Sequence, residues 1–151
     1  MTDIEILFKR ITECFNRNVL EALKGCAERY DTILRERGEG ESFFNITGNL
    51  RSSLGTAVID HGRKYFESQF ATIMNGTEGS SKGKSMIDTL TNQYMDCVAL
   101  VIVAAEDYAS FVEDKDSKDV VASVTTRAEL EVQKYIEQGI AKACKEINSW
   151  K

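Results

Sequence analysis

Residues 56–70 read TAVIDHGRKYFESQF, and this stretch decides the fold class of the chain. Two runs rich in β-branched and aromatic residues, 56–60 and 64–70, flank His61-Gly62, a pair that tolerates the positive φ of a tight turn. The pattern predicts a β-hairpin. His61 is the only histidine, so a Ser-His-Asp or Cys-His catalytic set would have to use it, and a polar turn residue is the favoured interpretation.

A long amphipathic helix is predicted before the hairpin, because apolar residues recur at steps of three and four from about residue 2 to residue 37. Thr2 and Glu5 form a capping box at its start, and Gly38-Glu39-Gly40 supply a stop. At about 1.5 Å per residue, such a helix is on the order of 50 Å long, longer than a compact domain of this size is wide. We therefore expect part of its apolar face to need a partner.

The sequence after the hairpin predicts a loop, a helix, a strand and a second long helix. Residues 75–84 are rich in Gly, Ser and Thr and predict a mobile loop, and residues 85–95 carry apolar side chains at helical spacing. Residues 97–104 form a continuous apolar run that predicts a buried central strand. The last helix is expected over 125–148, with Thr126 and Glu129 as a capping box.

These elements predict one α+β domain over residues 1–151, in which long N-terminal and C-terminal helices pack on a small, mostly antiparallel sheet with a hairpin and a central strand. The composition fits this, with 42% hydrophobic and 28% charged residues. A net charge of −5 with scattered basic residues disfavours binding to nucleic acid. We expect no membrane span and no export signal. The four cysteines lack metal-binding spacing, and reduced thiols are the simplest interpretation.

The segment Gly79–Ser85 raises an alternative, a small P-loop-like nucleotide-binding enzyme, because it looks like a phosphate-binding loop and the apolar strand ends in Glu106-Asp107. A phosphate loop needs four residues between its glycines, whereas Gly79 and Gly83 are separated by three. Glu78 stands where the first glycine should be, and its carboxylate would repel phosphate. A flexible Gly/Ser/Lys loop is the favoured interpretation.

Two further segments carry a resemblance to a known family. Residues 47–55 read TGNLRSSLG, and residues 108–113, after the apolar strand, read YASFVE. In this order and at this separation they resemble the tail-completion, or head-tail joining, proteins of tailed bacteriophages, which combine a T-G-x-L-R-x-S-[LI] turn, a hairpin and a later Y-A-x-[YF]-V-E segment. Asp119-Val120-Val121 is similar to the Asp-Val-Leu element that often follows. The chain departs from the family in having Glu106-Asp107 before Tyr108 and no proline.

The resemblance implies a small α+β virion subunit that forms a homo-oligomeric ring in the phage neck or upper tail. It implies no catalytic residues, cofactor or metal, and partners among neck, portal-side or tail proteins, for a product made in the bacterial cytoplasm and built into the virion. A cytosolic helical adaptor is a further alternative. The motif residues would serve structure and assembly: Thr47, Gly48, Asn49, Leu50, Arg51, Ser53, Tyr108, Ala109, Phe111, Val112 and Glu113.

Simple chemistry suggests a role for each kind of motif residue. Leu50, Tyr108, Phe111 and Val112 are expected to be core contacts. Gly48 and Gly55 would allow backbone turns. Arg51 and Glu113 would form an ion pair.

Overall fold

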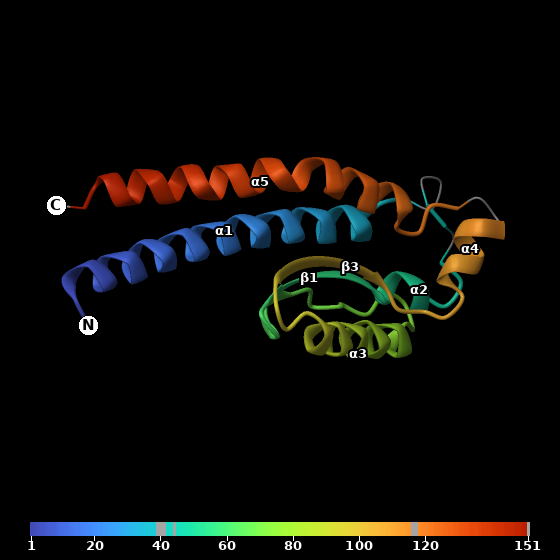
Figure 1. Cartoon of the computed structure of the whole chain (residues 1–151). Helices are drawn as coiled ribbons and strands as arrows, with labels where there is room; N and C mark the ends of the chain where they lie inside the picture. Colours follow the sequence, from blue (N-terminus) through green and yellow to red (C-terminus); the bar gives the residue numbers. More distant parts are fainter. Residues whose placement is uncertain (39–41, 44, 116–117, 151) are drawn as a thin grey trace.

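Two long helices form the upper layer of the molecule in the computed structural model, which describes residues 1–38, 42–43, 45–115 and 118–150 (Figure 1). α1 (Asp3–Glu36) and α5 (Ala122–Asn148) run side by side in opposite directions, so both chain termini lie at one end. The capping box of Thr2 and Glu5 is confirmed. Glu39 and Gly40, which belong to the expected stop of the first helix, lie outside the described residues.

Close packing joins α1 to α5. A Cβ atom on Gly139 would lie 2.8 Å from the carbonyl oxygen of Asn18, so glycine lets the two backbones approach. The Tyr30 hydroxyl donates to Glu131 at 2.5 Å, and Arg17 of α1 donates to Glu146 of α5. None of the helices within the described ranges is both long and apolar enough to cross a membrane.

A three-stranded antiparallel sheet lies beneath these helices, with strand order β2-β1-β3. β1 (Leu54–Asp60) and β2 (Arg63–Glu67) form the predicted hairpin, and its turn residues have positive φ, 47° at His61 and 78° at Gly62. β2 ends at Glu67 and not at the predicted Phe70, because Phe70 adopts a φ of 50° and its side chain is buried in the core.

β3 (Val98–Ala104) lies at the edge of the sheet, so the prediction of a central strand was wrong in position. Its apolar run has another cause, which is that helices cover both faces of the sheet. Leu100 and Ile102 pack against the cluster that includes α1 and α5. Val101 and Val103 pack on the opposite side, with Phe70 and Ile87. A strand covered on both faces reads as continuously apolar even at an edge.

α3 (Thr77–Gln93) covers that opposite face of the sheet (Figure 1). The predicted loop over 75–84 was therefore wrong, and the helix expected from residue 85 begins at Thr77. The glycines of α3 allow residues outside the helix to pack closely against it. A Cβ atom on Gly79 would lie 1.9 Å from the carbonyl oxygen of Asn49, and one on Gly83 would lie 2.3 Å from the Phe70 ring. Packing against the sheet layer outweighs the low helix propensity of glycine here.

The start of α5 also differs from the prediction. The helix begins at Ala122, and the Thr126 hydroxyl donates to the Ala122 carbonyl inside it, so Thr126 is no cap. The carboxylate of Glu113 accepts the N–H groups of Val121 and Ala122, both at 2.8 Å. The Glu113 side chain, which lies outside α5, thus accepts backbone N–H groups at the start of that helix. Local sequence spacing could not reveal this role.

Candidate docking site formed by the two sequence motifs

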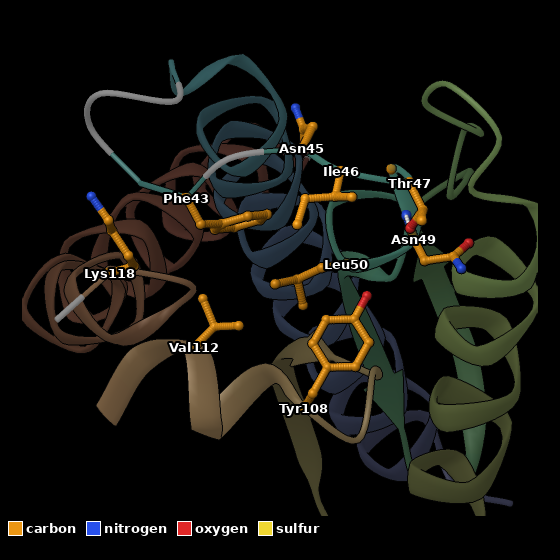
Figure 2. Close-up of a pocket in the computed structure, with 10 residues that line it drawn as sticks. Phe43, Asn45, Ile46, Thr47, Asn49, Leu50, Tyr108, Val112 and Lys118 are labelled. Carbon is orange, nitrogen blue, oxygen red and sulfur yellow. Dashed lines mark hydrogen bonds between the residues drawn. The ribbon is translucent and has the colours of Figure 1, made fainter. Parts of the chain in front are cut away.

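The two motif segments, far apart in sequence, line one pocket at the end of the molecule that holds α2 (Asn49–Ser52) and α4 (Ala109–Lys115) (Figures 1 and 2). Its volume is about 470 Å³. Figure 2 shows side chains from both segments turned toward the same open space, with the Tyr108 ring facing Leu50 and Val112. The lining residues are Phe43, Asn45, Ile46, Thr47, Gly48, Asn49, Leu50, Tyr108, Val112 and Lys118.

The first motif is a tight turn that fixes its neighbours. Gly48 has a φ of 83°, and a Cβ atom there would lie 2.0 Å from the Ile73 carbonyl oxygen, so only glycine fits. The Thr47 hydroxyl accepts the N–H of Asn49 at 3.3 Å. The Asn49 side chain in turn accepts the N–H of Gly79 at 3.3 Å, in the first turn of α3. The turn is thereby tied to the start of α3.

The end of the motif turns into the first strand. The Ser53 hydroxyl donates to the Leu50 carbonyl at 2.8 Å and closes α2. Gly55 does not close the turn as expected. It lies within β1, where a Cβ atom would come 2.4 Å from the Phe70 ring, so its role is to seat that ring.

Arg51 is the most buried charged residue of the site, with 3% of its surface exposed. Its guanidinium donates to four oxygen acceptors and stacks on Phe43, with its carbon 4.5 Å from the ring centre. The acceptors are Asn45 Oδ1 at 3.1 Å, Leu34 O at 3.3 Å, Ser42 Oγ at 2.8 Å and Phe43 O at 3.2 Å. Arg51 thus joins the end of α1 to the segment that forms one wall of the pocket.

The second motif supplies the opposite wall. Tyr108 is 42% exposed and Val112 is half-buried, while Ala109 is buried in the core. Burial and the nearby Glu106 charge raise the pKa of the Tyr108 phenol. Phe111 is 56% exposed, so the expectation that Tyr108 and Phe111 are core contacts was wrong.

The expected ion pair between Arg51 and Glu113 was also wrong. The ion pairs of the described residues do not include it. Each side chain instead satisfies backbone groups, carbonyls at Arg51 and the N–H groups that begin α5 at Glu113. A sequence motif shows which residues occur together. It does not show which backbone groups their side chains bind.

Next to this site, the residues of the nucleotide alternative form a structural ion pair. Lys82 on α3 lies 2.8 Å from Glu106, whose side chain is 3% exposed, and 3.1 Å from Glu78. These carboxylates raise the pKa of the Lys82 ammonium. Gly79–Ser85 lies within a helix, so its backbone N–H groups do not curl around a phosphate as a loop would.

The pocket offers apolar surface with a few polar groups, a lining that suits a small molecule as well as a protein side chain. Among the described residues that line it, Lys118 is the one charged side chain. The described part of the chain contains no cluster of three or more His, Cys, Asp or Glu residues suited to a metal ion. His61, 2.7 Å from Asp60, lies in the exposed hairpin turn, as predicted.

Sequence reasoning missed four lining residues, Phe43, Asn45, Ile46 and Lys118. Ile46 is 88% exposed, which the sequence alone did not indicate. Neither Phe43 nor Lys118 lies in a motif.

The four cysteines are free, and burial raises the pKa of the Cys26 thiol to about 11.

Comparisons of the chain with protein-family models, with curated proteins and with solved structures found no match.

Proposed function

We propose that the chain is a structural virion subunit of a tailed bacteriophage or prophage, a head-tail connector or tail-completion protein that associates into a ring and docks to neck or tail proteins. The observation that carries the proposal is the pocket itself. The two segments that resemble the family, 47–55 and 108–113, contribute to the walls of one pocket. If the two segments resembled the family only by chance, nothing would favour their meeting at one pocket.

The work done by the motif residues supports a structural role. Gly48 permits a turn, Arg51 organises a wall of the pocket, and Glu113 holds the start of α5. The polar atoms of Arg51 and Glu113 bind groups of the chain itself, as expected of residues that shape the fold. An assembly protein acts by presenting shaped surfaces on a stable fold.

Exposed apolar surface on α1 supports self-association. Ile4, Leu7 and Phe8 are each at least half exposed, near the free end of the helix. Clusters of large exposed apolar side chains on a folded protein mark sites of interaction. The proposed ring would cover them.

Deleting the gene for this chain from its phage tests the proposal. We expect filled heads and separate tails that fail to join or finish, with infectivity restored by the wild-type gene supplied in trans. Normal infectious particles made without the chain would refute the proposed role. Its absence from particles, together with stable binding to a host protein, would favour the helical adaptor.

A further inference from the structure

The strand β3 leaves one side of its backbone unpaired. The N–H of His61 donates to the Cys97 carbonyl at 3.0 Å, and from there on each residue of β3 lies opposite one of β1. Hydrogen-bonded pairs alternate along antiparallel strands, so Ala99, Val101 and Val103 turn their N–H and C=O groups toward β1. The backbone groups of the alternate residues face outward, away from the sheet: Val98, Leu100, Ile102 and Ala104. No hydrogen bond made by the described part of the chain reaches these outward groups.

The two edges of this sheet are built differently. β2 carries Arg63, Lys64 and Glu67, and its pairing with β1 is interrupted by a register shift. Charged side chains and such irregularities are common means by which proteins keep an edge strand from pairing with another chain. β3 reads VALVIVA, with no charged residue and no proline, and it pairs with β1 in an unbroken register. The protein thus protects one edge of the sheet and leaves the other open to a further strand.

A groove of about 380 Å³ runs beside this open edge and determines what kind of strand fits. Leu100 and Ile102 of β3 line one side of it, and Val132 and Ile136 of α5 line the other. Successive side chains of a strand point to opposite faces, so every second side chain of an added strand would enter the groove. Those side chains are expected to be apolar.

Glu129 of α5 is the one charged side chain among the described residues that line the groove. It is exposed, and it takes part in no ion pair or hydrogen bond within the described ranges. At the start of β3, an adjoining pocket holds Asp60 and Arg63, which carry opposite charges. Glu129 is therefore the charge that a partner would need to match, and a Lys or Arg side chain would match it.

We propose that the open edge of β3 binds an extended segment of a partner protein, which adds a fourth strand to the sheet. The segment carries apolar side chains at alternate positions and a Lys or Arg that faces Glu129. Hydrogen bonds to the outward backbone groups of β3 give affinity, and the groove selects the side chains. The inference goes beyond the proposed virion role and does not depend on it.

A second copy of this chain fits the same edge less well. The β2 strand of a second copy would bring Lys64 and Tyr65, whose side chains already bind Asp88 and Glu21. Its β3 strand would arrive with its own α5 and its own Glu129, which would repel the first Glu129 at the groove. An extended segment without a helix layer avoids both conflicts.

Binding of a synthetic peptide to the full-length protein tests the proposal. The probe Thr-Val-Thr-Val-Thr-Lys-Thr-Val-Thr-Val-Thr is apolar at alternate positions, and its central lysine lies at the same place in either strand direction. A second peptide has glutamate in place of the lysine. Fluorescence anisotropy of the labelled peptides measures affinity, and amide hydrogen exchange followed by NMR locates the bound strand.

We expect saturable binding of the lysine peptide to the wild type. Exchange of the Leu100 and Ile102 amides should slow by about tenfold or more in the complex, because these N–H groups gain acceptors. The amides of Val101 and Val103 already face β1, so their exchange should change little.

Two variants remove the features that carry the proposal. Val98→Pro/Ala104→Pro deletes two outward N–H groups and no hydrogen bond to β1, and it should weaken binding by about tenfold or more. Val98→Thr keeps the N–H and the side-chain shape and should bind like the wild type. Glu129→Lys, at an exposed residue, should reverse the preference, so that the glutamate peptide binds about threefold more tightly than the lysine peptide. Circular dichroism checks that each variant folds.

Three results would overturn the proposal. One is the failure of both peptides to bind the wild type at concentrations up to about 1 mM. Another is equal binding of the lysine peptide by the wild type, by the proline variant and by Glu129→Lys. The third is self-association of the wild type that slows exchange at Leu100 and Ile102 without peptide, because a second copy would then occupy the edge. Each result leaves the virion role standing, since gene deletion tests that role separately.

Discussion

At the scale of single residues, Arg51 is the clearest test of how the motif works. Lysine keeps the charge but lacks the planar fork, so Arg51→Lys should leave several of the four buried acceptors without a donor. We expect the free energy of unfolding in urea to fall by about 2–4 kcal/mol. Arg63→Lys, at an exposed arginine of β2, should change it by less than about 0.5 kcal/mol. Equal effects of the two substitutions would contradict the structural role of Arg51.

Substitutions of Lys82 and Lys84 distinguish a structural ion pair from a nucleotide-binding site. Lys82→Ala leaves the buried Glu106 carboxylate without its cation, and we expect a loss of up to about 3 kcal/mol, since Lys82 itself is one-third exposed. Lys84→Ala, at an exposed position one residue past Gly83, should change stability little. Calorimetry with ATP and GTP should detect no binding to either protein or to the wild type. Saturable micromolar binding of ATP or GTP that Lys84→Ala abolishes would instead support the nucleotide-binding enzyme.

At the scale of helices and strands, the glycines of α3 show that packing decides where the helix begins. Alanine is normally better than glycine inside a helix by about 0.5–1 kcal/mol. Gly79→Ala should nevertheless destabilise the protein by about 1–3 kcal/mol, because its Cβ would overlap the Asn49 carbonyl. Gly25→Ala in α1 has open space around the new atom and should show the ordinary helix gain. Thermal unfolding of both variants measures the difference, and a stabilised Gly79→Ala would be inconsistent with this packing.

The same elements show how far sequence reasoning reaches. Hydrophobic spacing predicted α1, α5 and the hairpin turn at His61-Gly62, because their apolar faces and turn chemistry are local properties. The helical start of α3 was missed, because its glycines are typical of a loop in sequence. Their role depends on close contacts with Asn49 and Phe70, which only the fold creates. The edge position of β3 was missed for a related reason. Coverage of both sheet faces by helices makes an edge strand look central in sequence.

The candidate site divides in the same way. Resemblance identified motif residues such as Leu50, Tyr108 and Val112, and these line the pocket. It could not identify the partners of Arg51 and Glu113, because backbone groups carry no sequence signature. Side chains from outside the motifs complete the pocket wall and depend on how the whole chain folds.

At the scale of the whole molecule, acid should loosen the pairing of the two long helices. Hydrogen bonds from Tyr30 and Arg127 lower the pKa of Glu131, and those from Arg17 and Asn18 lower that of Glu146, both from an ordinary value of 4.5. A lowered folded-state pKa stabilises the fold at pH values above about 4.5. This stabilisation is lost as the pH falls through the folded-state pKa values.

Thermal unfolding between pH 7 and pH 3 measures this dependence. The variant Glu131→Gln/Glu146→Gln should be less stable at pH 7 and should lose less stability than the wild type as the pH falls below about 4.5. Glu137→Gln, at an exposed glutamate of α5, serves as the control and should follow the wild type. Equal acid sensitivity of the wild type and the double variant would show that these two carboxylates do not hold the helices together.

The central claim is that this chain is a ring-forming subunit at the junction of a phage head and tail. Electron cryomicroscopy of purified virions, with density sought for two long antiparallel helices over a three-stranded sheet, tests it most directly. The account predicts a ring of such subunits in the neck or upper tail. Neck and tail density fully explained by other chains, with no peptide of this one in the particles by mass spectrometry, would contradict it.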